Sequence, residues 1–432
     1  MLESYFKLKE HGTTVRTEVI AGITTFLTMG YIIFVNPDIL AQAGIDKDAA
    51  FVATCLAAAF GTLLMGLVAN YPIALAPGMG VNAFFTYTVV LGQGYSWQVG
   101  LGAVFLSGIL FLILSVLPIR QWIINAIPKS QKMAIAAGIG MFLAIIALEN
   151  MAAVVDHPVT LVTLGDLGQP AVLLSIFCFL MIVTLEIRKI PGAIILSIIT
   201  TTVIGVMLGI SNFGGVVSMP PDLSPTFAQL DIAGAFNVGM TGIILAFLFV
   251  HMFDTAGTLV TVANAANLMD KDGNLPRLGK TLMADSTSML AGSVIGTSPV
   301  TSYIESTAGV NAGGRTGLTA VVVAMLFLAS LFLAPLVSSI PSYATFPVLL
   351  FVATLMMKNL VKIDWEDMTE YVPAVITVII MPLSYSIADG IGFGMITYAL
   401  LKLLTGRIDK NNISVLIMAV IFISKYAFLG VH

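Results

Sequence analysis

The sequence predicts an all-α polytopic membrane protein, and three observations support this fold class. Hydrophobic residues fill 58% of the 432 positions and charged residues only 10%, whereas soluble proteins average about 25% charged residues. Apolar runs of about 20 residues, the length of a helix that crosses a bilayer, recur along the whole chain. Basic residues gather at alternate ends of these runs, as the positive-inside rule expects for a multi-pass protein.

The apolar runs correspond to about 14 membrane-spanning segments. In order they are 16–35, 49–69, 74–92, 99–117, 133–148, 171–187, 191–210, 238–259, 280–294, 298–311, 316–338, 345–357, 371–387 and 389–405. A further run at 413–430 is either another span or a helix at the membrane surface. With the N-terminus in the cytoplasm, every Lys and Arg except Lys47 and Lys425 falls at an inner end or inner loop. We therefore expect a cytoplasmic N-terminus, and the connections 149–170 and 211–237, which contain no Lys or Arg, should lie outside.

Several classes of function are disfavoured by what the chain lacks. Its two cysteines, Cys55 and Cys178, both lie inside apolar runs, and the sequence shows no Cys/His cluster, HExxH, GxSxG, P-loop or EF-hand pattern. The net charge is −4 and no basic stripe occurs. We therefore expect no resident metal or cofactor, no catalytic residues, no ATP-driven pumping and no nucleic-acid partner.

Two segments interrupt the pattern of plain spans. The first is "YPIALAPGMGVNAFF" at 71–85 and the second is "IGTSPVTSYIESTAGVNAGG" at 295–314. Pro77 and Pro299 lie about half the chain apart, and each interruption follows two spans of its own half. Because seven spans per half place the second half upside down, this pattern predicts inverted repeats, in which paired broken segments mark a binding site near the midplane.

Ionisable side chains inside the eighth run point to the same place. "FVHMFDTAGTL" at 249–259 holds His251 and Asp254 three residues apart, so both project from one side of a helix. A charged group at the bilayer centre costs about 2.5 kcal/mol or more. The run should therefore turn this polar stripe toward a cavity or a neighbouring helix.

The interruptions and the first span contribute further candidate ligand contacts. The second interruption holds Tyr303 and Glu305, the first holds Asn82 and Phe84, and the first span has a milder polar face that includes Thr28. Carboxylates, an imidazole, an amide, hydroxyls and aromatic rings together suit a flat, polar, hydrogen-bonding ligand.

Purely structural interpretations remain open for these residues. His251 is also explained as a neutral histidine bonded to a neighbouring helix, and Asp254 as an acceptor that holds the broken segments. Asn82 is also explained as a cap of a half-helix, and the aromatic rings as ordinary packing. Glu305, a carboxylate in an interrupted span, is the hardest to explain by structure alone.

These residues resemble the nucleobase–cation symporter-2 type of purine permease, in particular its AzgA-like branch. The matching stretches are "TTFLTMGYIIFVNP" (24–37), "APGMGVNAFF" (76–85), "FVHMFDTAGTL" (249–259) and "GTSPVTSYIESTAGV" (296–310). One position departs from the pattern, because guanine and hypoxanthine permeases of this branch usually have an aspartate where this chain has His251.

The resemblance implies a core domain from spans 1–4 and 8–11 and a gate domain from the other spans, with short extended strands in the broken spans 3 and 10. The halves of the core domain are then 1–118 and 228–338, and those of the gate domain are 119–227 and 339–432. By motif, the binding positions are Asn82, His251, Asp254, Tyr303 and Glu305. The resemblance also suggests a homodimer.

The sequence thus favours proton-coupled import of purine nucleobases across the cytoplasmic membrane. Glu305 and Asp254 are the candidate proton acceptors, and sodium coupling stays open. A neutral imidazole at His251 can donate to the bare ring nitrogen of adenine, so we expect adenine to be preferred over guanine and hypoxanthine. The alternatives are an anion transporter of the related sulfate-permease fold and an intramembrane metal-dependent hydrolase that uses His251, Asp254 and Glu305.

Overall fold

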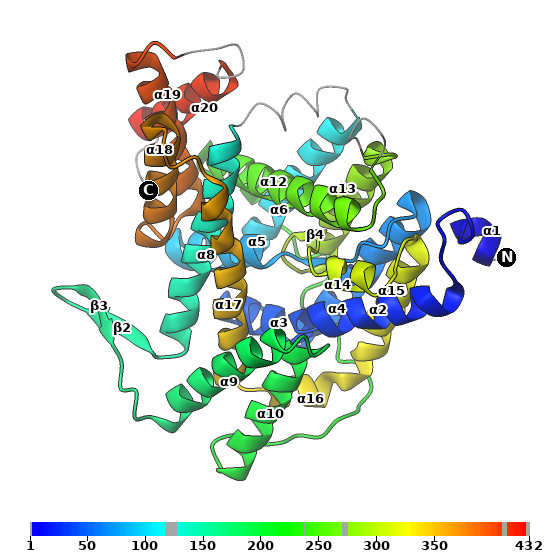
Figure 1. Ribbon diagram of the computed structural model, residues 1–432. Coiled ribbons are helices and arrows are strands. Elements are labelled where there is room, and N and C mark those ends of the chain that lie inside the picture. The colour runs from blue at the N-terminus through cyan, green and yellow to red at the C-terminus, as the bar shows by residue number, and fades with distance from the viewer. Residues whose placement is uncertain (1, 117–127, 237, 270–274, 408–412, 429–432) are drawn as a thin grey trace.

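The computed structural model describes residues 2–116, 128–236, 238–269, 275–407 and 413–428. Among these residues, nine helical stretches are long and apolar enough to cross a membrane. Shorter apolar helices accompany them at Met79–Gly92, Ala193–Met207, Met368–Leu383 and Val415–Ser424. The protein is therefore a multi-pass, largely α-helical membrane protein (Figure 1).

One group of helices surrounds the two interrupted segments. It consists of α2 (Val15–Met29), α3 (Ile32–Gln42), α4 (Lys47–Leu64), α6 (Trp97–Val116), α12 (Thr241–Ala265), α13 (Leu278–Ile295) and α15 (Gly317–Ser330). In this group α15 packs against α2 and α4, and α13 packs against α4 and α6. Elements from both halves of the sequence therefore interleave around the interruptions.

A second group lies beside the first. It consists of α8 (Lys129–Asn150), α9 (Pro170–Ile187), α10 (Ala193–Met207), α17 (Ser342–Met357), α18 (Met368–Leu383) and α19 (Ile387–Leu404). Helix α8 runs along α17 and α18, and α9 packs on α10 and α17 (Figure 1). Helix α20 (Ile413–Phe428) packs on α19. Both predicted alternatives for this segment, a further span or a helix at the membrane surface, stay open.

Short connecting elements complete the described chain. They are α1 (Leu2–Phe6), the π-helical η1 (Met65–Ala69), α11 (Ile232–Ala235), η3 (Val238–Met240), η4 (Leu331–Leu333), α16 (Ala334–Ser339) and η5 (Lys358–Lys362). A hairpin of β2 (Val154–His157) and β3 (Leu161–Leu164) projects from the end of α8 (Figure 1). The sequence analysis did not predict this hairpin.

Each interrupted segment contains a short strand followed by a half-helix. Strand β1 (Leu75–Pro77) precedes α5 (Met79–Ala83) and the π-helical η2 (Phe84–Gly92), and β4 (Val300–Ser302) precedes α14 (Ser306–Asn311). The strands pair antiparallel, with Leu75 opposite Ser302 and Pro77 opposite Val300. Because lipid offers no hydrogen bonds, irregular backbone at this depth must be covered by protein or line a cavity. The pairing of one interruption with the other meets part of this requirement.

Candidate functional site

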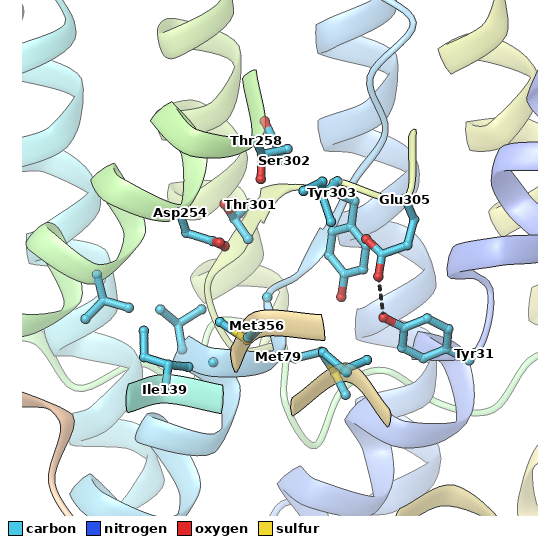
Figure 2. Close-up of a pocket in the computed structure, with 16 residues that line it drawn as sticks. Tyr31, Met79, Ile139, Asp254, Thr258, Thr301, Ser302, Tyr303, Glu305 and Met356 are labelled. Atoms are coloured by element: carbon cyan, nitrogen blue, oxygen red, sulfur yellow. Dashed lines mark hydrogen bonds between the residues drawn. The ribbon is translucent and has the colours of Figure 1, made fainter. Parts of the chain in front are cut away.

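A cavity of about 100 Å³ lies where the paired strands meet α12. Strand β4 and the turn after it bring Thr301, Ser302, Tyr303 and Glu305 to its wall, and α12 adds Asp254 (Figure 2). The first interruption contributes residues 78–81, including the side chain of Met79 (Figure 2). The opposite wall is apolar and comes from α8 and α17, through Ile139, Val352 and Met356.

Glu305 is held at the cavity by the turn that starts α14. Its carboxylate oxygen Oε1 accepts a hydrogen bond of 2.7 Å from the Tyr31 hydroxyl, which comes from the junction of α2 and α3 (Figure 2). Thr28 does not line the cavity, because its hydroxyl turns to backbone carbonyl groups, including that of Glu305 at 3.5 Å. Thr28 therefore supports the position of Glu305 from behind.

Asp254 and Tyr303, two of the predicted site residues, both line the cavity. The Asp254 side chain opens onto the cavity beside Thr301 (Figure 2). The Tyr303 ring lines the same cavity, and its hydroxyl donates to the carbonyl oxygen of Pro77. Tyr303 thus ties the second interruption to the first while its ring stays available to a ligand.

His251 lies behind the cavity wall in this structure, and its predicted contact with the ligand stays a prediction. Its side chain is fully buried and is not part of the cavity lining. Its Nε2 atom lies 2.6 Å from Oδ2 of Asp285 on α13, and its ring meets Phe111 edge-on. Positions i and i+3 differ by about 60° around a helix, so His251 faces α13 while Asp254 faces the cavity.

Asp285 is a buried carboxylate that the sequence analysis overlooked. It is fully buried and accepts hydrogen bonds from Thr255 (2.8 Å) and Ser302 (2.7 Å) in addition to its contact with His251. The sequence does contain a signal for this residue, because Asp285 is an ionisable residue in the middle of the apolar run 280–294. An ionisable residue inside a span is a functional candidate by default.

Asn82 belongs to a sealed polar cluster instead of the cavity. It is fully buried and donates from Nδ2 to Oδ1 of Asn36. Asn36 in turn donates to the hydroxyls of Thr54 (2.7 Å) and Thr297 (2.9 Å), and Ser298 donates back to Asn36 at 3.1 Å. This Asn36 cluster joins both interruptions to α3 and α4.

Phe84 also lies away from the cavity. Its ring is fully buried and packs edge-on against Phe247 of α12, with 4.9 Å between ring centroids. The geometry therefore supports the packing interpretation for Phe84.

Comparison with known proteins agrees with this architecture. A family model described as a permease family matches residues 16–423. The adenine permease AdeP of Escherichia coli (strain K12) is 50% identical over 432 residues, which cover 100% of this chain and 97% of that protein. The guanine/hypoxanthine permease PbuG of Bacillus subtilis (strain 168) is 44% identical over 440 residues, covering 99% of this chain and 100% of that protein.

A solved structure has the same fold despite low identity. The transmembrane domain of the cyanobacterial bicarbonate transporter BicA superposes with a TM-score of 0.67 at 15% identity, over 87% of this chain and 97% of that chain. At this identity the likeness concerns the fold alone. Because the family model covers almost the whole chain, this protein belongs to the permease family and is a transporter, not an enzyme.

Proposed function

We propose that this permease imports purine nucleobases, with adenine preferred, and that a proton drives the import. The observation that carries the proposal is the cavity itself, which lies beside the paired strands of the two interruptions and is lined by two carboxylates, Asp254 and Glu305. Relatives named as adenine and guanine/hypoxanthine permeases, similar over the full chain, support the substrate class.

The two walls of the cavity suit a flat heteroaromatic base. Asp254, Thr301 and Glu305 offer polar atoms on one side, whereas Val352 and Met356 offer an apolar surface on the other. Small-molecule sites typically combine apolar contact with a few placed polar groups. A purine has apolar faces and a polar edge, so it satisfies both walls at once.

Proton coupling follows from the need for a driving ion. The membrane potential supplies no free energy for the entry of a neutral base, whereas the entry of one proton releases about 2.3 kcal/mol of free energy per 100 mV. Glu305 and Asp254 are the acceptors in contact with the cavity. Glu305 is favoured because it starts the half-helix of an interruption, where movement changes its exposure.

The proposed transport cycle uses fourteen spans in two inverted halves, with the N-terminus in the cytoplasm and the protein in the cytoplasmic membrane. The core domain, 1–118 with 228–338, moves against the gate domain, 119–227 with 339–432. The cavity between Asp254 of α12 and the apolar residues of α8 and α17 supports this division. A homodimer through the gate domain completes the proposal.

Uptake measurements test the proposed substrate. Cells that lack their own purine permeases and express this protein should accumulate radiolabelled adenine, and unlabelled adenine should compete. Hypoxanthine, guanine, uracil, sulfate and bicarbonate are the comparison substrates. Saturable uptake of sulfate or bicarbonate without purine uptake would establish the anion-transporter alternative instead.

Collapsing the proton gradient separates the coupling ion from the substrate. A protonophore should abolish adenine accumulation at constant external sodium. Accumulation that survives the protonophore but requires sodium would replace the proton by sodium and leave the substrate assignment intact.

A further inference from the structure

The hydroxyl groups of the cavity wall have fixed donor directions because of Asp285. Each hydroxyl carries a single hydrogen and two lone pairs. Thr255 gives its hydrogen to Oδ2 of Asp285 at 2.8 Å, and Ser302 gives its hydrogen to Oδ1 at 2.7 Å. Both hydrogens therefore point away from the ligand.

The hydrogen bond from Thr255 to Asp285 also determines which way the Thr301 hydroxyl in the cavity wall donates. The hydroxyl oxygens of Thr255 and Thr301 lie 3.0 Å apart. Since the hydrogen of Thr255 is already engaged by Asp285, Thr301 must be the donor in this second hydrogen bond. Thr301 and Ser302, which both line the cavity, are thus left with lone pairs for a ligand.

Asp254 benefits from the same arrangement. It lies beside Thr301 in the cavity wall (Figure 2) and also accepts from the Thr301 hydroxyl, so the single hydrogen of Thr301 is held by Thr255 and Asp254 together and does not point toward the ligand. A carboxylate has about four lone-pair sites, so Asp254 keeps acceptor sites for the ligand, more of them while Thr255 also accepts from Thr301. The wall formed by Asp254, Thr301 and Ser302 is therefore an acceptor surface.

The contact of His251 with Asp285 keeps the Thr255 and Ser302 hydroxyls donating toward Asp285. A proton shared by His251 and Asp285 lies between Nε2 and Oδ2, which are 2.6 Å apart. In either placement of that proton, Thr255 and Ser302 remain donors toward Asp285. His251 therefore acts on the wall through Asp285, Thr255 and Thr301, without reaching the ligand.

We infer that this relay makes the permease select purines with an amino group at carbon 6 over purines with a carbonyl there. The inference rests on the proposed purine transport. An exocyclic amine donates to the acceptor surface, whereas a carbonyl oxygen faces lone pairs and leaves its own hydrogen bond unmade, which carries a cost. Thr255 and Asp285 are then specificity-positioning residues that touch no substrate.

Replacing His251 by a carboxylate should weaken or reverse the preference for an amino group over a carbonyl at carbon 6. Two carboxyl groups at close range do not both ionise, so one of them keeps a proton. In His251→Asp, Asp285 is able to carry that proton and donate it to Thr255. Thr255 then donates to Thr301, and the hydrogen of Thr301 turns toward the cavity, where it suits a carbonyl.

The test uses two ligand pairs that differ at carbon 6. Adenine is compared with hypoxanthine, and 2,6-diaminopurine with guanine, as competitors of labelled adenine uptake. Thr255→Val breaks the relay with almost no change in shape, and Thr255→Ser is the matched control that keeps the hydroxyl. We expect Thr255→Val to lower the amino-over-carbonyl preference about fivefold or more in both pairs, while Thr255→Ser stays within about twofold.

The order of the relay is tested by combining variants. His251→Asp should shift the preference strongly in the parent background and much less in Thr255→Val, since the route to Thr301 is then missing. Detergent-solubilised protein is checked by adenine-dependent thermal stabilisation, so a variant that does not transport still reports its ligand preference.

The possible outcomes separate this inference from the proposed function. An unchanged preference in Thr255→Val, or equal His251→Asp shifts in both backgrounds, overturns the relay but leaves purine transport standing. A parent protein that prefers hypoxanthine and guanine also overturns it. A parent that neither transports nor binds any purine overturns both.

Discussion

The two interrupted segments share a backbone design but differ in chemistry. Each has a short strand followed by a half-helix, and the strands pair with each other. The first interruption buries its polar and aromatic side chains, Asn82 and Phe84, inside the protein. The second presents Tyr303 and Glu305 to the cavity. A repeated backbone therefore supplies a scaffold in one half and recognition in the other.

The first interruption also lines the cavity, at residues 78–81, and comes very close to the second strand there. Glycine and small residues let another chain come close, and Gly78 packs directly on the second strand: a Cβ atom there would lie 2.5 Å from Cγ2 of Thr301. The amide of Gly78 also donates to the carbonyl of Pro299 at 2.9 Å. The scaffold thus fixes the position of Thr301 through close contact and a backbone hydrogen bond.

The largest effect is expected where the second interruption carries its charge. Glu305→Gln keeps the shape and an acceptor for Tyr31 but removes the ionisable group. Accumulation of labelled adenine in energised vesicles with an imposed proton gradient should be abolished, whereas exchange of internal for external adenine should persist. Tyr31→Phe, the control, removes only the hydrogen bond to Glu305 and should reduce accumulation far less. Full gradient-driven accumulation by Glu305→Gln would remove Glu305 from proton coupling.

A second large effect should come from the strand contact between the interruptions. Gly78→Ala forces the two strands apart, because the new methyl group collides with Thr301. We expect uptake to fall about tenfold or more and thermal stability in detergent to drop, since overpacking costs about 1–3 kcal/mol. Gly94→Ala is the comparison: a Cβ there meets nothing within 4 Å, although the positive φ of 72° adds local strain. Gly78 has a φ of −75°, which any residue adopts, so equal losses in both variants would show that the loss at Gly78 is not specific to the strand contact.

The Asn36 cluster should affect stability much more than recognition. Asn82→Ala removes a buried hydrogen bond to Oδ1 of Asn36, which keeps only the Ser298 hydroxyl as a donor, a loss of about 0.5–1.5 kcal/mol. Thermal unfolding of the purified protein should shift downward, while the ranking of purine competitors should stay that of the parent. A changed ranking at unchanged thermal stability would place Asn82 at the ligand after all, as motif resemblance implies.

The fold was largely accessible from the sequence because the bilayer restricts the possible structures. Apolar runs located the helices, and the interruptions at 71–85 and 295–314, where the family resemblance implies short strands, contain the strands at 75–77 and 300–302. Lipid accepts no unpaired backbone, so such interruptions are conspicuous. The hairpin Val154–Leu164 lies in a connection where this restriction does not apply, and it was missed.

The candidate site was only partly accessible for a different reason. Asp254, Tyr303 and Glu305 do line the cavity, but His251 and Asn82 do not. Sequence spacing gives the face of a helix but not the neighbour that the face meets. The partner of His251 is Asp285, 34 residues away on another helix. Hydrogen bonds between helices depend on packing, and no local pattern in the sequence encodes them.

The substitution with the smallest expected effect tests whether Phe84 of the first interruption ever contacts a ligand. Phe84→Leu keeps an apolar group of similar bulk and loses the edge-on contact with Phe247. Such aromatic pairs contribute about 0.5–1.5 kcal/mol beyond their buried area. Thermal stability should therefore fall slightly. Competition by adenine should change by less than about twofold, because the loss of a ring that stacks on the base would weaken binding more than that.

Phe85→Leu is the matched control, since Phe85 is equally buried and also lies outside the cavity lining. If Phe84→Leu weakens every planar competitor about tenfold while Phe85→Leu does not, Phe84 reaches the substrate in another state of the transport cycle. The first interruption would then share in recognition, and the contrast between the two halves would hold only for the state described here.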